Sequence, residues 1–278
     1  VPVHQIVKRI KSMLKNRLIP IMFLKNGHIV RSQNFETFQI IGDHLSQLER
    51  LSSWNADELV YIDITREDDV DFHRQDKKVV QKSSLLDLVE QISKSAFMPL
   101  TLGGGIVDVE TAVTLIQKGA DRVLINTKAH TTDTLLADIV KIIGSQAVVV
   151  GIDTKRVEGK IIPYVGGGKV KLETNIIDLA KRAEDLGAGE LLLNSIDRDG
   201  SALGYDLDCI NLVADAVKIP VIACGGVGNF GHFFDCLAEG KAAAVAAGNI
   251  FHFTENSYRR AKKFLLSRGA NVRPFDQQ

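Results

Sequence analysis

Eight short apolar runs alternate along the chain with longer segments in which apolar residues recur at helical spacing. Each run is rich in β-branched residues and bounded by turn-forming residues, as is typical of buried strands. The pattern predicts strands at 18–24, 58–64, 97–102, 121–126, 147–153, 190–196, 219–224 and 242–247. It predicts helices near 43–53, 83–95, 108–118, 131–143, 174–186, 206–217, 229–239 and 257–268.

The predicted strands are almost continuously apolar, as in Ala147–Val150, which is typical of parallel strands covered on both faces. Strand–helix alternation repeated eight times predicts an α/β fold, a closed (β/α)8 TIM barrel. A doubly wound open sheet is the alternative, and the absence of a GxGxxG turn after the first strand disfavours it. In a barrel, the loops after the carboxyl ends of the strands form one end, the mouth, where catalytic residues gather.

The two halves of the chain resemble each other. Matched segments occur in the same order in both halves: 20–26 with 149–155, 56–60 with 188–192, 99–105 with 220–226, and 118–121 with 239–242. Such a repeat predicts two similar half-barrels and further favours the closed barrel. In this register, the second half has Asp153 where the first half has Phe23.

The composition limits which kinds of partner the protein can bind and in which cell compartment it is expected. The chain has 278 residues, a formal net charge of +0 and a pI near 7.2, which excludes a general attraction to nucleic acid or acidic lipid. Three cysteines without a CxxC pair, and no apolar stretch of membrane-spanning length, lead us to expect a cytoplasmic protein. The histidines show no metal-ligand spacing, so neither a metal nor an organic cofactor is expected. Residues 1–12 are expected to be an extension, natural or left by cloning, before a single barrel domain at 13–278.

Glycine-rich turns follow two strands that the repeat relates. Gly103–Gly105 and Gly225–Gly226 leave main-chain N–H groups open to an anion. The next strand of each half ends close by, in Asn126–Thr127 and in Ala247–Gly248, and the second of these loop pairs is the usual phosphate position of the fold. The alternative is that the glycines only make tight turns. Two related cradles together predict a long ligand with a phosphate at each end.

Carboxylates between the two glycine turns are candidates for catalysis. Asp153 ends the fifth predicted strand among apolar residues, so it is placed for general acid or base work. A salt bridge with Lys155 or Arg156 is the alternative for this side chain. After the sixth strand, Asp199 is the better candidate for a mouth contact, because the two charges of Asp197–Arg198 are expected to pair with each other.

A resemblance to one known family runs from about residue 13 to 273. It is densest in Arg17–Pro20, Lys25–Gly27, Asp57–Thr65, Gly103–Ile106, Gly144–Val150, Ile152–Val157, Ser195–Gly200 and Gly204–Asp206. These segments resemble the cyclase subunit of imidazole glycerol phosphate synthase. It implies a glutamine-dependent enzyme of histidine biosynthesis. In this family, a glutaminase partner releases ammonia, which crosses the barrel and reacts with a bis-phosphorylated ribulosyl substrate. The products are imidazole glycerol phosphate and an aminoimidazole carboxamide ribotide.

The resemblance also implies roles for single residues. The second catalytic aspartate of the family falls on Asp153, and its mouth aspartate falls on Asp199. Its phosphate-binding glycines fall on Gly104, Gly105, Gly225 and Gly226.

A charged ring at the base of the barrel, through which ammonia is thought to enter, falls on Arg17, Glu58, Arg122 and Glu190. Arg122 stands where the family usually has lysine. Surface ion pairs are the alternative for these four residues. The same resemblance places Asp121 in the interface with the glutaminase.

The chain departs from the family pattern at the mouth. The first catalytic aspartate falls on Phe23, which cannot exchange protons, so cyclase activity is expected to be reduced or lost. Arg31 replaces a lysine, Asn194 a threonine and Cys224 a serine beside the phosphate glycines. The loop at 66–78 is longer and more acidic than in the family, although it can also be read as a solvated surface loop.

Three functions fit these features. The first is a paralogue that docks a glutaminase and conducts ammonia to other chemistry, such as amidination of bacterial surface sugars by a separate enzyme. The second is an authentic histidine-pathway cyclase that relies on Asp153. The third is a non-catalytic scaffold that binds a phosphorylated ligand.

Overall fold

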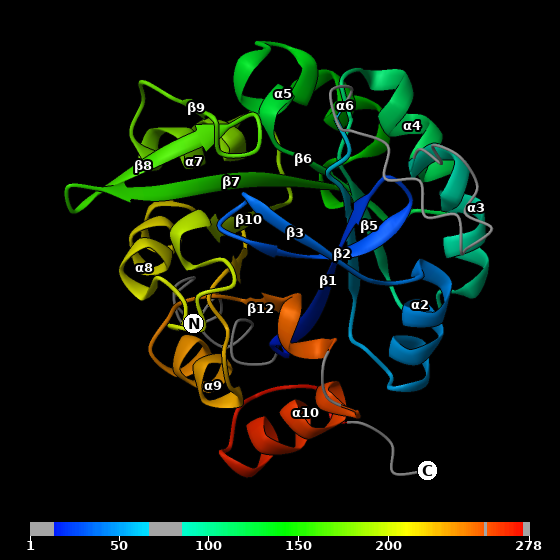
Figure 1. The fold of residues 1–278 in the computed structure, drawn as a ribbon. Coiled ribbons are helices and arrows are strands. Elements are labelled where there is room, and N and C mark those ends of the chain that lie inside the picture. The colour runs from blue at the N-terminus through cyan, green and yellow to red at the C-terminus, as the bar shows by residue number, and fades with distance from the viewer. Residues whose placement is uncertain (1–13, 67–84, 253–254, 275–278) are drawn as a thin grey trace, which may run out of the picture.

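The computed structural model describes residues 14–66, 85–252 and 255–274. Eight parallel strands form a closed barrel, because the last strand pairs with the first through Arg17↔Ala244 to Pro20↔Ala247 (Figure 1). The predicted TIM barrel is therefore confirmed. Its strands are β1 (Arg17–Lys25), β4 (Leu59–Asp63), β5 (Leu100–Gly103), β6 (Arg122–Ile125), β7 (Val148–Val157), β10 (Glu190–Ser195), β11 (Val221–Cys224) and β12 (Ala244–Ala247).

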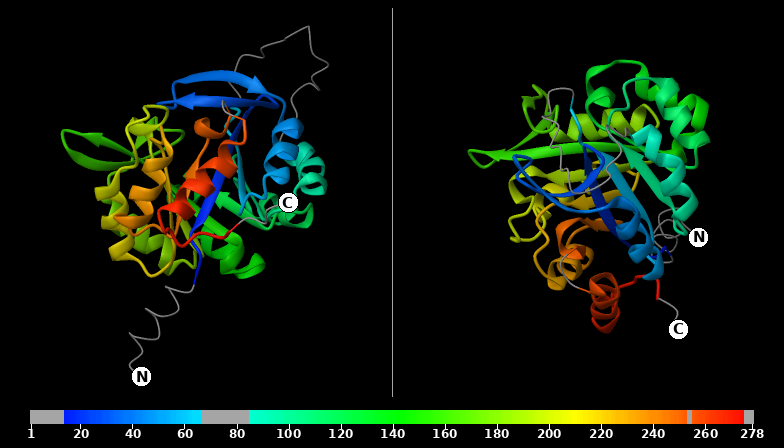
Figure 2. Two further views of the ribbon diagram at one scale, coloured as in Figure 1. Left: turned by 90° about the horizontal axis from the view of Figure 1, so that it is seen from below. Right: turned by 45° about the vertical axis from the view of Figure 1, so that its right-hand side comes forward.

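Helices surround the barrel on its outer face (Figures 1 and 2). They are α2 (His44–Ser53), α3 (Leu85–Ser95), α4 (Val109–Gln117), α6 (Leu135–Ile143), α7 (Ile176–Asp185), α8 (Leu207–Ala216), α9 (Phe230–Ala238) and α10 (Ser257–Ser267). The prediction of one helix at 131–143 is wrong at its start. A separate helix, α5 (Thr127–Thr131), ends at Thr132, whose extended backbone interrupts the helical path. Three single turns complete the list: η1 (Ser145–Ala147), η2 (Ile196–Arg198) and η3 (Asn249–Phe251).

Two antiparallel extensions at the mouth were not predicted. The hairpin β2 (His28–Gln33) and β3 (Thr37–Gly42) follows β1, and β8 (Lys160–Val165) and β9 (Val170–Lys171) follow β7. Both begin at a two-residue turn with positive φ, Asn26–Gly27 in one half and Glu158–Gly159 in the other. The internal repeat therefore extends to the turns that start these hairpins.

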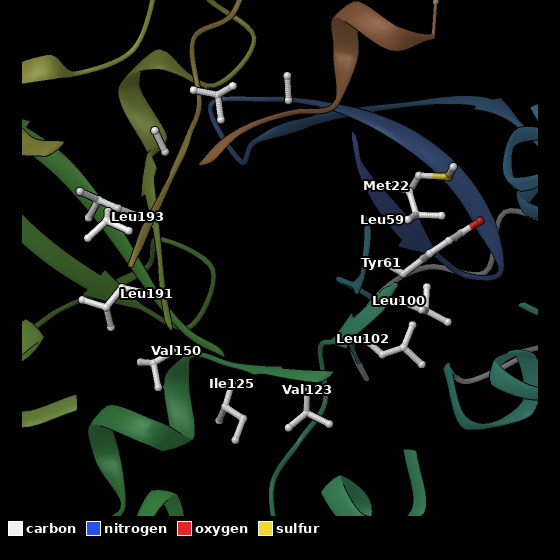
Figure 3. Close-up of a cluster of buried hydrophobic side chains, with 14 of the residues drawn as sticks. Met22, Leu59, Tyr61, Leu100, Leu102, Val123, Ile125, Val150, Leu191 and Leu193 are labelled. Carbon is white, nitrogen blue, oxygen red and sulfur yellow. The ribbon is translucent and has the colours of Figure 1, made fainter. Parts of the chain in front are cut away.

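The apolar residues form two layers. The outer layer lies between the strands and the helices and includes Met22, Tyr61 and Leu102 (Figure 3). Successive side chains of a strand point to opposite faces, so every second side chain points into the barrel. These inward side chains form the inner layer, and we call the space that they fill the lumen. The lumen cluster includes the inward residues of the strands: Ile19, Ile21, Phe23, Val60, Leu124, Val149, Leu192, Ile222, Cys224, Ala244 and Ala246.

Candidate active site

Asp153 is buried at the mouth, at the end of the lumen. Only 7% of the residue is exposed, and neighbouring strand ends hold both of its oxygens. Asn126 Nδ2 donates to Oδ2 over 2.7 Å, and Asn194 Nδ2 donates to Oδ1 over 3.3 Å. Burial raises the pKa of Asp153 to about 6, although the two amide bonds act to lower it. A carboxyl with this pKa can both take up and release a proton near neutral pH.

The alternative salt bridge for Asp153 does not form. Arg156 instead pairs with Asp206, at 2.7 Å from Nε and 2.6 Å from Nη2. The Lys155 ammonium lies 5.1 Å from the centre of the Tyr164 ring. Asp153 therefore has neutral amide partners, and the carboxyl can be protonated or charged without breaking an ion pair.

Replacing Asp153 by asparagine is expected to remove a pH-dependent cost to stability. Because the folded-state pKa of this acid is raised, the cost is absent below the unfolded value near 3.8 and complete above about 6. The shift corresponds to roughly 3 kcal/mol. In urea unfolding, the wild type should lose roughly this much free energy relative to Asp153→Asn between about pH 4 and pH 7. The exposed Asp133→Asn variant is the control, and parallel curves for wild type and Asp153→Asn would contradict the assignment.

Phe23 occupies the lumen. It is 9% exposed and belongs to the lumen cluster together with Val30 and Cys224. A Cβ added to Gly248 would lie 3.7 Å from a carbon of the Phe23 ring, so the ring packs against the end of β12. In the register of the internal repeat, Phe23 takes the place that Asp153 has in the other half, so an apolar ring stands there instead of a carboxylate.

Asp199 fastens the hairpin β2–β3 to the loop after β10. Its Oδ2 accepts a 2.6 Å hydrogen bond from Ser32 Oγ, and its carbonyl accepts one of 3.1 Å from the Asn34 N–H. Asn249 Nδ2 donates to the Ser32 carbonyl over 2.9 Å, which ties the same hairpin to the end of β12. Figure 2 shows the hairpin lying across one end of the barrel. Burial raises the pKa of Asp199, whereas the Ser32 bond and the charge of Arg31 act to lower it.

The loop after β10 makes contacts that differ from those expected. The expected pairing of Asp197 with Arg198 is wrong, because Asp197 accepts from the Arg156 N–H and Arg198 donates to the carbonyls of Leu203 and Gly204. The contact of Ser32 with Asp199 was missed. A serine in a predicted loop carries no signal in the sequence that would single it out.

The glycine turns have positive φ angles, which favour glycine: 95° at Gly104, 66° at Gly105, 91° at Gly225 and 101° at Gly226. A Cβ at Gly104 would lie 2.0 Å from the Asp63 carbonyl oxygen, and one at Gly226 would lie 2.1 Å from that of Gly204. Chain packing alone therefore requires glycine at these two positions, and phosphate binding stays a prediction.

The other residues assigned to the cradles lie at the same end of the barrel. Thr127 Oγ1 accepts a 3.1 Å bond from the Gly166 N–H. Cys224 and Ala247 are buried at strand ends, and burial raises the pKa of the Cys224 thiol. Arg31 lies half-buried on β2. The structure thus brings the predicted mouth residues to one end of the barrel.

The charged ring lies at the opposite end. Arg17 Nη1 is 2.7 Å from Glu58 Oε2, and the same guanidinium bonds to Glu190. Arg122 Nη1 is 3.2 Å from Glu58 Oε1 and 3.0 Å from Glu190 Oε2. Each arginine therefore bridges both glutamates. Thr101, which was not predicted, adds a 2.9 Å hydrogen bond to Glu58 Oε1.

These are not surface ion pairs. The side chains of Glu58 and Glu190 are 2% and 7% exposed. Burial raises the pKa of Glu190, while Arg17 and Arg122 act to lower it. The desolvation of Arg17 is outweighed by the two carboxylates, so the pKa of its guanidinium is raised. Next to the ring, exposed Asp121 accepts a 2.8 Å bond from the Leu100 N–H.

Residues 1–12 and most of the acidic loop at 66–78 lie outside the described residues. Among the residues that the structure describes, none of the helices has the length and apolar character to cross a bilayer. Within the same ranges, there is no group of three or more side chains arranged to hold a metal ion.

Comparison with known proteins places these features in a family. The profile of the family described as "Histidine biosynthesis protein" matches residues 17–257. The chain is 40% identical over 261 residues to imidazole glycerol phosphate synthase subunit HisF of Chlorobium luteolum and to that of Chlorobaculum tepidum, covering 94% of this chain and 100% of each relative. It is also 40% identical over 261 residues to the HisF subunit of a Thermotoga strain, covering 94% of this chain and 98% of the relative.

Proposed function

Because this chain belongs to the histidine biosynthesis protein family and resembles its HisF cyclase subunits, we propose that it is the barrel subunit of a glutamine-dependent amidotransferase complex. A glutaminase partner releases ammonia at the charged ring, and the ammonia crosses the barrel to the mouth. The buried ring is the observation that carries the proposal. Glu58 and Glu190 are buried, and Arg17 and Arg122 are partly buried. Such charges are costly unless they are closely paired, and apolar residues would close the base of a barrel at least as well.

The lumen suits a small neutral molecule. Between the ring and Asp153, inward side chains such as Ile21, Val149 and Leu192 are apolar. An ammonium ion would lose its hydration there without gaining a partner, whereas neutral ammonia loses far less. Asp153 then stands at the exit as a group that can exchange a proton with what arrives.

The chemistry at the mouth differs from ring closure. A benzyl group at Phe23 supplies neither acid nor base, and help of this kind typically contributes about 10²–10⁴-fold in rate. Ammonia therefore passes to another acceptor, for example a sugar that a separate enzyme converts to an amidine. The paired glycine turns support a ligand with two phosphates as the occupant or regulator of the mouth.

Two other functions each rest on one observation. The retained Asp153, with a pKa near 6, favours an authentic cyclase in which this residue does the work alone. The glycine turns, together with an apolar Phe23 at the mouth, favour a scaffold that binds a phosphorylated ligand without catalysis. The retention of a buried ring weighs against the scaffold, and Phe23 weighs against the cyclase.

An assay fed with ammonium salt tests ring closure without any glutaminase. The purified barrel, given the bis-phosphorylated ribulosyl substrate of the family, is expected to turn over at least about 100-fold more slowly than a HisF subunit under the same conditions. In the same way, the gene should not restore growth of a histidine-requiring strain that lacks its cyclase. Turnover or growth at the level of the HisF control would establish the cyclase alternative instead.

Docking of the glutaminase is expected to depend on Phe97. This side chain is 88% exposed and lies in the segment between α3 and β5. The segment leads into the start of β5, at the same end of the barrel as the charged ring. Exposed aromatic residues are frequent anchors of interfaces. Phe97→Ser should weaken binding of a co-purified glutaminase about 10–100-fold in calorimetry without changing thermal stability. Leu203→Ser is the matched control, because Leu203 is 73% exposed at the mouth end, and equal losses in both variants would contradict this docking face.

A further inference from the structure

A buried polar cluster joins α10 to the base of the barrel. Lys262 is 1% exposed, and its ammonium bonds to Asp57 Oδ1. Tyr258, one turn earlier in α10, is fully buried. Its hydroxyl accepts a 2.8 Å hydrogen bond from the Asp57 N–H and donates one of 3.0 Å to the Leu18 carbonyl. The Leu18 N–H in turn donates to Asp57 Oδ2 over 3.1 Å.

The cluster replaces backbone pairing between β1 and β4 at a level where these two strands are not yet paired, although β1 already pairs with β12. β1 and β4 pair from Ile21↔Val60 onward, so Leu18 stands beside Asp57, before the first residue of β4. At this level the Asp57 carboxylate and the Tyr258 hydroxyl satisfy the Leu18 N–H and carbonyl. One helix therefore holds the beginnings of two strands together through side chains.

Members of the charged ring are the next residues along both strands. Arg17 precedes Leu18, and Glu58 follows Asp57. Because successive side chains point to opposite faces, Leu18 and Asp57 face α10 while Arg17 and Glu58 face the axis of the barrel. Any shift of the Leu18 or Asp57 backbone would move a ring member with it. A buried lysine without its carboxylate is strongly disfavoured, so the cluster holds one arrangement.

We propose that Tyr258, Asp57 and Lys262 are positioning residues for the charged ring, setting the separation at which Arg17 meets Glu58 and Glu190. The meaning of the ring as an ammonia entrance rests on the proposed function. The mechanical link between α10 and the ring does not, so the two can fail separately.

The test compares two variants that each remove one buried hydroxyl. Tyr258→Phe removes the hydroxyl that links the Asp57 N–H to the Leu18 carbonyl and leaves the direct bond from the Leu18 N–H to Asp57 Oδ2 in place. Tyr205→Phe removes a comparable hydroxyl bond of 2.9 Å to the Ala246 carbonyl, near the mouth. The readout is the titration of the Glu190 carboxyl, followed by carbon-13 NMR in the full chain. Arg17, Arg122 and Glu58 are the charged groups that face it.

Tyr258→Phe is expected to raise the titration midpoint of Glu190 by about half a pH unit or more, because a displaced Arg17 no longer stabilises the charged carboxylate. Tyr205→Phe should leave this midpoint unchanged even where it lowers stability. An unchanged midpoint in Tyr258→Phe, or an equal shift in both variants, would overturn the positioning role. This measurement does not depend on glutaminase docking. If the glutaminase failed to dock, that result would count against the proposed function and not against the positioning role.

Discussion

Replacing Phe23 by aspartate is expected to lower the free energy of unfolding by about 3–5 kcal/mol at neutral pH. The substitution removes an aromatic side chain from the lumen cluster and leaves a carboxyl among Val30, Leu124 and Cys224. Burial at this position desolvates the carboxyl, so its charged form is disfavoured. Urea denaturation at pH 7 measures the loss.

Phe23→Leu is the control for volume, since it keeps the site apolar and should cost less than about 1.5 kcal/mol. If the aspartate variant were as stable as the leucine variant, the Phe23 site would be polar or open to water, contrary to its packing. In the ammonia-fed assay, Phe23→Asp should gain ring-closing turnover over Phe23→Leu, because it introduces the aspartate that the family resemblance implies at this position. The gain should be partial if Arg31, Asn194 and Cys224 also depart from the family pattern, as the sequence resemblance implies.

Replacing Arg17 by methionine is expected to cost about 3–5 kcal/mol of unfolding free energy at pH 7. The change leaves two buried carboxylates, Glu58 and Glu190, with a single arginine between them. The cost should shrink as the pH falls toward the pKa of Glu190, which is already raised by burial, because a neutral Glu190 no longer needs a cation. Denaturation at pH 5 and pH 8 measures both effects.

The matched control for Arg17→Met is Lys241→Met, which removes a cation from an exposed pair with Asp215. This change should cost less than about 1 kcal/mol, because exposed ion pairs contribute little. If both variants lost the same small amount, the four ring charges would be solvated and the passage between them open. Such a result would remove the main support for a built entrance at the base of the barrel.

The sequence contained most of the fold because its strands and helices follow simple periodicities. Continuous apolar runs and helical spacing predicted every barrel strand, and the repeat predicted that Asp153 and Phe23 occupy equivalent places. The turns Asn26–Gly27 and Glu158–Gly159 were a usable signal for the mouth hairpins, and the former is a strong hairpin dipeptide. Those hairpins were nevertheless not predicted, because alternation of strands and helices predicts the barrel strands alone.

What the sequence by itself determined is the closed barrel, its duplication and the presence of Phe23 where the second half has Asp153, since each is written in local pattern or residue identity. The tertiary structure alone decided which side chains meet. Arg156 pairs with Asp206 and not with Asp153, and Ser32 in the first half of the chain donates to Asp199 in the second half. Such contacts join residues far apart in sequence, and hydrogen bonding depends on distance and direction that periodicity does not encode.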